Sequence, residues 1–152
     1  EVINVNITGI FLVTQKFSSL LKKSKKNPSI INISSIYGVI APDQRIYNGA
    51  KYLGQNINTP ACYSVSKSAV LGFTNYLSSY WLDLGIRANS ISPGGILSGQ
   101  NEAFLKKYSK KVPLNRMANV NEIIDSIIFL RSDKSTYING QNIIVDRGLS
   151  KW

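Results

Sequence analysis

The sequence predicts an α/β fold, in which helices cover both faces of a parallel sheet. Short apolar runs rich in β-branched residues alternate with longer segments whose apolar residues recur at helical spacing. This alternation implies crossover connections between neighbouring parallel strands. The chain has 152 residues, of which 43% are hydrophobic and 17% charged, and this composition predicts one globular domain over residues 1–152.

Three helices and three strands are predicted, in strict alternation. The first helix ends before Asn27-Pro28, because proline lacks an amide donor and restricts the residue before it. Gly85 is well placed to end the second helix. Residues 38–60 are polar and contain several glycines and prolines, so we expect a long loop there, and such loops are usually functional. The elements are helix Val2 to about Lys23, strand Ile30–Ile33, helix Ala61 to about Leu84, strand Ile86–Ile91, helix Asn121–Leu130 and strand Gln141–Val145.

The formal charge of +10 raises the question of a nucleic-acid partner, because basic proteins attract phosphate backbones. The only dense run, at Lys22, Lys23, Lys25 and Lys26, stands where the first helix should end, and cations are favoured there by the helix dipole. The other lysines are scattered, with no interleaved aromatic residues. We therefore predict no nucleic-acid partner.

No apolar run approaches the roughly 18 residues that a membrane helix needs, so we predict no membrane association. The single cysteine, Cys62, excludes an internal disulfide and fits a reducing cytoplasm. We expect a cytoplasmic protein without a metal site. The chain starts at Glu1 without methionine and already in a helical pattern, which suggests a piece of something longer.

Tyr63 and Lys67 stand four residues apart near the start of the second predicted helix, so both side chains lie on one helical face. A phenol can act as a general acid and base, and a neighbouring ammonium group favours the phenolate form. Such a pair alone occurs by chance on many helices. Here, however, Ser35 follows the first predicted strand, and α/β sheets bind ligands at the carboxyl ends of their strands.

Five features, in order along essentially the whole chain, resemble the short-chain dehydrogenase/reductase family. The resemblance implies a nicotinamide-dependent oxidoreductase with a Rossmann-like doubly wound parallel sheet. Only the C-terminal portion of that fold is present, because the glycine-rich N-terminal half would lie upstream. The five features are Val5-Asn6-Ile7-Thr8-Gly9, Asn32-Ile33-Ser34-Ser35, the segment from Tyr63 to Lys67, the segment from Ile86 to Gly94, and Ile138-Asn139-Gly140-Gln141 before Val145-Asp146.

The resemblance also implies a role for each matching residue. Ser35, rather than Ser34, matches the serine that hydrogen-bonds the substrate, and Tyr63 matches the proton donor and acceptor. Lys67 matches the lysine that supports ionisation of the tyrosine and holds the nicotinamide ribose, so Tyr63 and Lys67 also count as cofactor-binding residues. Asn6 matches the asparagine that holds a water in the proton relay. The expected lining of the nicotinamide is Pro93, Gly94 and Ile96, with Ser98 where the family usually has a threonine.

Two departures from the family pattern bear on function. The residues that distinguish NAD from NADP belong to the absent half, so the implied cofactor is NAD or NADP. Ser35 and Tyr63 are 28 positions apart, which is longer than usual, so the extra stretch Asp43–Thr59 should flank the substrate site. In that stretch Tyr47 and Tyr52 could hydrogen-bond a polyhydroxylated ligand.

Near the C-terminus, Arg147 replaces a common glycine, which implies a changed turn if that position needs a positive φ. The long connection, the segment Pro93–Ile96 and the ending Tyr137–Asp146 resemble bacterial members linked to surface-sugar and flagellin-modification pathways.

The first functional hypothesis is therefore an oxidoreductase that interconverts a hydroxyl and a carbonyl on a small-molecule substrate, such as a sugar or sugar nucleotide. The 152 residues alone are expected to be inactive. The alternative is a non-catalytic subunit or remnant that keeps only the association surfaces of the family. In either case the resemblance implies a homo-oligomer, a dimer or a tetramer, built through the first two helices and through the last helix and strand.

Overall fold

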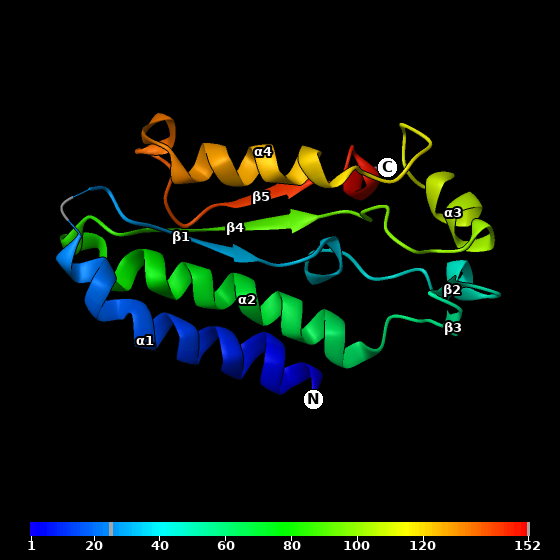
Figure 1. The fold of residues 1–152 in the computed structure, drawn as a ribbon, viewed down its shortest axis with the longest axis horizontal. Helices are drawn as coiled ribbons and strands as arrows, with labels where there is room; N and C mark the ends of the chain where they lie inside the picture. The colour runs from blue at the N-terminus through cyan, green and yellow to red at the C-terminus, as the bar shows by residue number, and fades with distance from the viewer. Residues whose placement is uncertain (25, 152) are drawn as a thin grey trace.

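The computed structural model describes residues 1–24 and 26–151, so Lys25, one of the lysines in the dense basic run, lies outside the described residues. The chain folds into three layers, with a parallel sheet between helices on its two faces (Figure 1). The predicted α/β fold is therefore confirmed. The sheet has the strand order β1-β4-β5, with β1 at Ser29–Ile33, β4 at Arg87–Pro93 and β5 at Asn142–Val145. Helices α1 (Ile10–Lys23) and α2 (Ala61–Tyr80) cover one face, and α4 (Val120–Arg131) covers the other.

The middle strand, β4, is buried along its whole length because it has a parallel neighbour on each side. Its register against β1 places Ile33 beside Ile91. Its buried Asn89 donates from Nδ2 to the carbonyl of Ile138 and accepts from the backbone N–H of Gln141, both at 2.9 Å. These bonds satisfy a polar side chain that would otherwise destabilise the core.

Apolar side chains fill the space between the sheet and the helices on both faces. Burying one such side chain contributes about 1.5–3 kcal/mol, so these residues hold the layers together. The buried apolar residues are Leu77, Trp81, Ile86 and Ala88 on the α2 face, and Ile91, Ile123 and Leu130 on the α4 face.

The first predicted helix is continuous but not uniform. Residues 2–23 are helical as expected, yet Asn4–Gly9 forms a π-helical turn before α1 begins at Ile10. A π turn has i→i+5 hydrogen bonds and is often found at functional sites. Apolar spacing reports which face of a helix is buried and not the hydrogen-bond ladder, so it could not predict this wider turn.

The segment predicted as a long loop contains structure of its own. A 3₁₀ turn spans Gln44–Tyr47, and a short hairpin pairs β2 (Lys51–Tyr52) with β3 (Gln55–Asn56). Between the two strands Leu53 has a φ of 48° and Gly54 a φ of 81°, which is the backbone that a tight two-residue hairpin turn requires. Leucine rarely adopts a positive φ, so no residue pattern predicted this hairpin.

The second predicted helix ends one turn early. Helix α2 stops at Tyr80, Leu82–Leu84 forms a 3₁₀ turn, and Gly85 follows with a φ of 67°. Trp81, which is buried in the core, has a φ of −117° and a ψ of 20°, so the helical backbone ends at this residue.

One helix was not predicted. Helix α3 spans Glu102–Ser109 and lies with the hairpin at the carboxyl end of the sheet (Figure 1). Asn101 caps it by accepting a hydrogen bond from the backbone N–H of Phe104 at 3.2 Å. Phe104 and Tyr108 are buried on one face of this helix, in a core cluster separate from those beside the sheet.

Within the described residues, no helix combines the length and the apolar character needed to cross a membrane. The same part of the chain contains no group of three or more His, Cys, Asp or Glu side chains placed to hold a metal ion. Arg147 has a φ of 54°, so the turn at the expected position does require a positive φ.

Candidate active site

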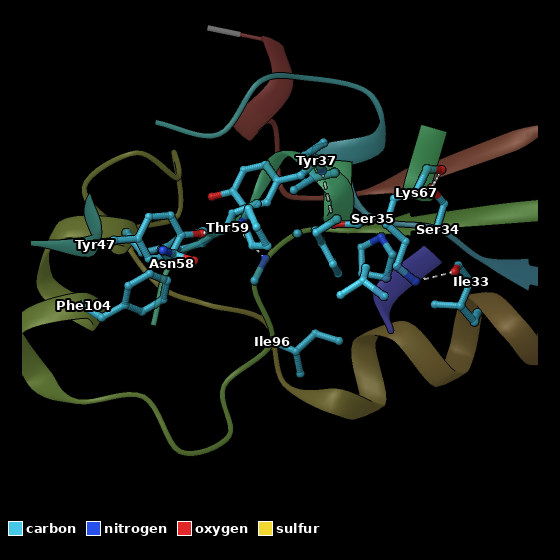
Figure 2. Close-up of a pocket in the computed structure, with 18 residues that line it drawn as sticks. Ile33, Ser34, Ser35, Tyr37, Tyr47, Asn58, Thr59, Lys67, Ile96 and Phe104 are labelled. Atoms are coloured by element: carbon cyan, nitrogen blue, oxygen red, sulfur yellow. Dashed lines mark hydrogen bonds between the residues drawn. The ribbon is translucent and has the colours of Figure 1, made fainter. Parts of the chain in front are cut away.

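A cavity of about 520 Å³ opens at the carboxyl ends of β1 and β4 (Figure 2). This is where parallel α/β sheets bind ligands. The cavity brings together six of the eight residues to which the family resemblance assigns a role, which are Ser35, Tyr63, Lys67, Pro93, Gly94 and Ile96. The remaining lining residues are Val2, Ile33, Ser34, Ile36, Tyr37, Tyr47, Asn58, Thr59, Pro60, Gly95, Phe104 and Tyr108.

The two serines after β1 have different partners. The Ser34 hydroxyl donates to the backbone carbonyl of Lys67 at 2.7 Å, so it ties the strand end to α2. The Ser35 hydroxyl only accepts, from the backbone N–H of Tyr37 at 3.2 Å, where it caps the short 3₁₀ turn Ile36–Gly38. Its own proton remains available to a ligand. The expectation that Ser35, rather than Ser34, faces the substrate fits this arrangement.

Tyr63 and Lys67 lie in the first two turns of α2. The Nζ atom of Lys67 is 5.8 Å from the centroid of the Tyr63 ring. It donates to the backbone carbonyl of Ile33, the last residue of β1, at 3.0 Å (Figure 2). Partial burial lowers the pKa of Lys67 below its ordinary value, because desolvation disfavours the charged form.

Asn6 does not line the cavity, but its side chain is hydrogen-bonded to helix α2, which carries Tyr63 and Lys67. From the π-helical turn it donates from Nδ2 to the Ser66 hydroxyl at 3.0 Å. Ser66 is fully buried, and its hydroxyl donates in turn to the backbone carbonyl of Tyr63 at 2.7 Å. The side chain of Asn6 therefore supports the backbone that carries Tyr63.

Backbone atoms after β4 form another side of the cavity. The N–H of Gly94 donates to the carbonyl of Val145 at 2.9 Å, which holds the segment beside β5. The N–H of Gly95 donates to the Tyr108 hydroxyl, and a Cβ added to Gly95 would lie 2.6 Å from the Tyr108 ring. Ser98, in contrast, is exposed and outside the lining, and its N–H donates to Oε1 of Gln100 at 2.9 Å.

Several lining residues were missed by sequence reasoning. Tyr47 was named as a ligand contact and does line the cavity, whereas Tyr52 does not, because it lies in β2 and bridges to Gln100. The spacing of Phe104 and Tyr108 after the Asn101 cap was the signal for a helix that would bring aromatic residues here. Asn58 and Thr59 belong to the stretch Asp43–Thr59, which was expected to flank the substrate site, whereas Tyr37, Phe104 and Tyr108 were not named from the sequence.

Comparison with known sequences gives a family match. Residues 52–150 match the family model described as Enoyl-(Acyl carrier protein) reductase. The chain is 33% identical over 148 residues to Post-translational flagellin modification protein A of Campylobacter coli, which covers 97% of this chain and 56% of that protein. It is 34% identical over 162 residues to the ribulose-forming D-arabinitol 2-dehydrogenase of Candida tropicalis, covering all of this chain and 52% of that protein.

Solved structures agree with this match. A short-chain dehydrogenase from Leptospira borgpetersenii, crystallised with bound NAD+, superposes with a TM-score of 0.85 at 40% identity, covering 96% of this chain and 54% of that one. Other matching structures were determined with NADP or with NADH. The chain thus spans about half the length of the relatives that it matches. The family model covers well over half of the chain, and the chain belongs to the short-chain dehydrogenase/reductase family.

Proposed function

We propose that the protein is an NAD(P)-dependent oxidoreductase that interconverts a hydroxyl and a carbonyl group on a small-molecule substrate. One observation carries this proposal: Ser35, Tyr63 and Lys67 line a single cavity at the carboxyl ends of two parallel strands. No other function suggested by the sequence needs these three groups together.

The residues present fit the nicotinamide end of a dinucleotide. A Cβ at Gly95 would meet Tyr108 and Met117, so these side chains pack directly on the backbone after β4 and hold that side of the cavity in place. Pro93, Gly94 and Ile96 are proposed to line the nicotinamide, and Tyr63 and Lys67 to hold its ribose. Ser98 is proposed as a cofactor contact through the loop that follows. When bound, the dinucleotide supplies or accepts the hydride.

In the direction of oxidation, Tyr63 in its phenolate form would take the proton of the substrate hydroxyl while the hydride leaves the carbon that bears it. A carbonyl remains, and in reduction both transfers reverse. The Lys67 ammonium favours the charged form of the phenol that accepts the proton. The free proton of Ser35 donates to the substrate oxygen, where negative charge develops. Asn6 is proposed to serve the proton relay, and its bond to Ser66 supports a role in holding the start of α2.

The substrate is proposed to be a sugar or a sugar nucleotide. The flagellin-modification and D-arabinitol relatives support this choice by their names. The stretch Asp43–Thr59 supports it by position, since Tyr47, Asn58 and Thr59 line the cavity beside the reacting groups.

A homo-oligomer, a dimer or a tetramer, is part of the proposal, as are a single domain over residues 1–152 and a cytoplasmic location. Phe11, Phe17 and Leu20 on α1 and Tyr76 and Tyr80 on α2 are all exposed. Exposed apolar patches mark interaction surfaces. The same patches favour a second candidate, a non-catalytic subunit that keeps only the association surfaces.

Turnover by the full-length protein separates the two candidates. The absorbance of the reduced nicotinamide is followed with D-arabinitol, gluconate and acetoacetyl-CoA as probes, each with both dinucleotides. Turnover that falls at least about 100-fold in Ser35→Ala supports the enzyme. Dinucleotide binding without turnover of any probe supports the non-catalytic subunit.

A further inference from the structure

Hydroxyl groups line the cavity on the side away from the reacting residues. We call Tyr47, Thr59 and Tyr108 the hydroxyl wall. In Figure 2, Tyr47 and Thr59 lie at one end of the cavity, and Ser35 and Lys67 lie toward the other. None of the three has a part in the hydride or proton transfer described above.

The hydrogen bonds of the wall leave a donor for a ligand. The hydroxyls of Tyr37, Tyr47 and Thr59 form a chain joined by two hydrogen bonds, one between the two tyrosines and one between Tyr47 and Thr59. In the bond between the Tyr47 hydroxyl and Oγ1 of Thr59 either group can donate. Two hydrogen bonds use two of the three protons, so one proton of the chain remains for a ligand. Thr59, at the end of the chain, is buried against the cavity, and its hydroxyl can donate or accept there.

Tyr108 offers a second donor in the same way. Its hydroxyl oxygen accepts the N–H of Gly95, so its own proton is not used in that bond. Burial raises the pKa of Tyr108 to about 12, which keeps it neutral at physiological pH. The Tyr47 ring stacks on Phe104, and Phe104 packs on Tyr108, with ring centroids 5.6 Å and 5.5 Å apart, so the wall is held by rigid aromatic groups.

The charged groups that line the cavity restrict the chemical class of the ligand further. Among the described lining residues, Lys67 alone carries a formal charge. Since Lys67 is assigned to Tyr63 and the ribose, the described lining offers no second cation to a carboxylate or phosphate. An acyl chain would leave the buried hydroxyl donors without partners, which is unfavourable. A neutral ligand that carries several hydroxyl groups satisfies both conditions.

We infer that the cavity takes a small, uncharged, polyhydroxylated substrate, such as a sugar alcohol or the corresponding keto sugar, and that Thr59 and Tyr108 select it by hydrogen-bonding hydroxyl groups beyond the reacting carbon. This inference rests on the proposed function. It narrows the substrate class and assigns specificity to residues outside the catalytic group.

Binding without turnover tests the inference directly. Full-length protein is saturated with NADH, and its melting temperature is followed as D-arabinitol, xylitol or sorbitol is added, since the reduced dinucleotide cannot oxidise them. A ligand that binds only the folded state raises the melting temperature. At least one polyol should do so, and Thr59→Val should raise the concentration required about 3- to 10-fold, the effect of one lost hydrogen bond.

Matched variants separate recognition from folding. Thr59→Ser keeps the hydroxyl and should restore binding, and Tyr47→Phe, which keeps the ring stack, should weaken it. Tyr52→Phe, in the same segment but outside the cavity, should change nothing. In turnover with NAD(P)+, Thr59→Val should raise the KM for the polyol by the same factor, with little change in kcat.

Two results would overturn the inference and leave the proposed function standing. One is turnover of acetoacetyl-CoA with no binding of any polyol. The other is polyol affinity that is equal in wild type and Thr59→Val. Bound dinucleotide with no turnover of any probe would instead remove the proposed function, and this inference with it.

Discussion

The ammonium nitrogen of Lys67 lies 5.8 Å from the centre of the Tyr63 ring, one helical turn along α2. Helix geometry fixes this spacing, so it does not depend on a flexible loop. A phenol paired with an ammonium group is the arrangement that a tyrosine needs to act as general acid and base. Each of the two side chains can therefore be tested by a single substitution.

Replacing Tyr63 with Phe keeps the ring and removes the hydroxyl. Loss of a general acid–base typically costs at least about 100-fold, so kcat of the full-length enzyme should fall by that factor, and dinucleotide affinity should fall by a smaller factor because the proposed ribose contact of the hydroxyl is lost. Tyr76→Phe is the control, because Tyr76 is an exposed tyrosine of the same helix. Steady-state kinetics of Tyr63→Phe and Tyr76→Phe measure kcat for this comparison. Near-wild-type turnover of Tyr63→Phe would end the assignment.

Replacing Lys67 with Met should weaken dinucleotide binding and lower kcat together, because one side chain serves both the ribose and Tyr63. The folding stability of Lys67→Met, in contrast, should not decrease. Burial lowers the pKa of Lys67, which means that the folded protein holds its charge at a cost at neutral pH. The melting temperature of the apoprotein should therefore stay equal or rise. Unchanged dinucleotide affinity would contradict the ribose contact.

The elements that the sequence predicted are those that repeat a simple pattern. Strands β1 and β5 are half-buried and read as short apolar runs, and α2 carries a regular apolar stripe. The hairpin at Lys51–Asn56 could not be predicted, because Leu53 takes a positive φ in a turn whose backbone is also hydrogen-bonded to Gly99, a residue distant in the sequence.

The residues of the candidate site also fall into a group that the sequence predicted and a group that it could not predict. Ser35, Tyr63 and Lys67 are tied to the ends of regular elements, so their spacing in the sequence predicted that they would meet. Thr59 and Tyr108 come from segments that meet only in the folded chain, 49 positions apart, and no local pattern relates them. Ser98 has the expected place in the sequence, but its loop leaves it exposed and outside the cavity.

Glu122 should make stability depend on acid pH. The Arg116 guanidinium, the backbone N–H of Asn119 and Arg147 hold the pKa of this carboxyl well below its ordinary value of 4.5. A carboxyl whose pKa is lower in the folded than in the unfolded protein stabilises the fold at pH values above its unfolded-state pKa. This stabilisation is lost as the pH falls through its folded-state pKa. Glu122→Gln should therefore lower the melting temperature at pH 7, and the difference from wild type should shrink below about pH 4.5.

Glu102→Gln is the matched control for this measurement, because Glu102 makes no ion pair in the part of the chain that the structure describes. The melting temperatures of wild type, Glu122→Gln and Glu102→Gln are compared from about pH 3 to 8, a range that spans the pKa of an ordinary carboxyl group. A Glu122→Gln difference that is the same at all pH values would show that the ionised form is not what stabilises the fold.

Gly95 and Gly72 should respond oppositely to alanine. A Cβ at Gly95 would lie 2.6 Å from the Tyr108 ring and 2.7 Å from Met117, so Gly95→Ala should destabilise by about 1–3 kcal/mol and weaken dinucleotide binding. Gly72 lies inside α2 with open space around it, so Gly72→Ala should stabilise by about 0.5–1 kcal/mol. Chemical denaturation measures both. Equal stability of the two variants would contradict the close packing at Gly95.

The 152 residues on their own should bind a dinucleotide only weakly. No G-x-G-x-x-G sequence, the turn that commonly anchors the pyrophosphate, occurs among them. Tyr63, Lys67 and the segment after β4 reach only the nicotinamide end. Within the described residues, the outer edge of β1 has no neighbouring strand, and an unpaired apolar edge favours association.

Titration of the purified 152-residue chain with NADH and NADPH, followed by nicotinamide fluorescence, checks this expectation. The full-length protein is the reference, and gel filtration reports whether the shorter chain self-associates. We expect no saturable binding at micromolar dinucleotide and a tendency to oligomerise through the β1 edge and the apolar face of α1. If the shorter chain bound either dinucleotide with micromolar affinity, the contacts at the nicotinamide end would suffice, and the glycine-rich turn would not be the main anchor.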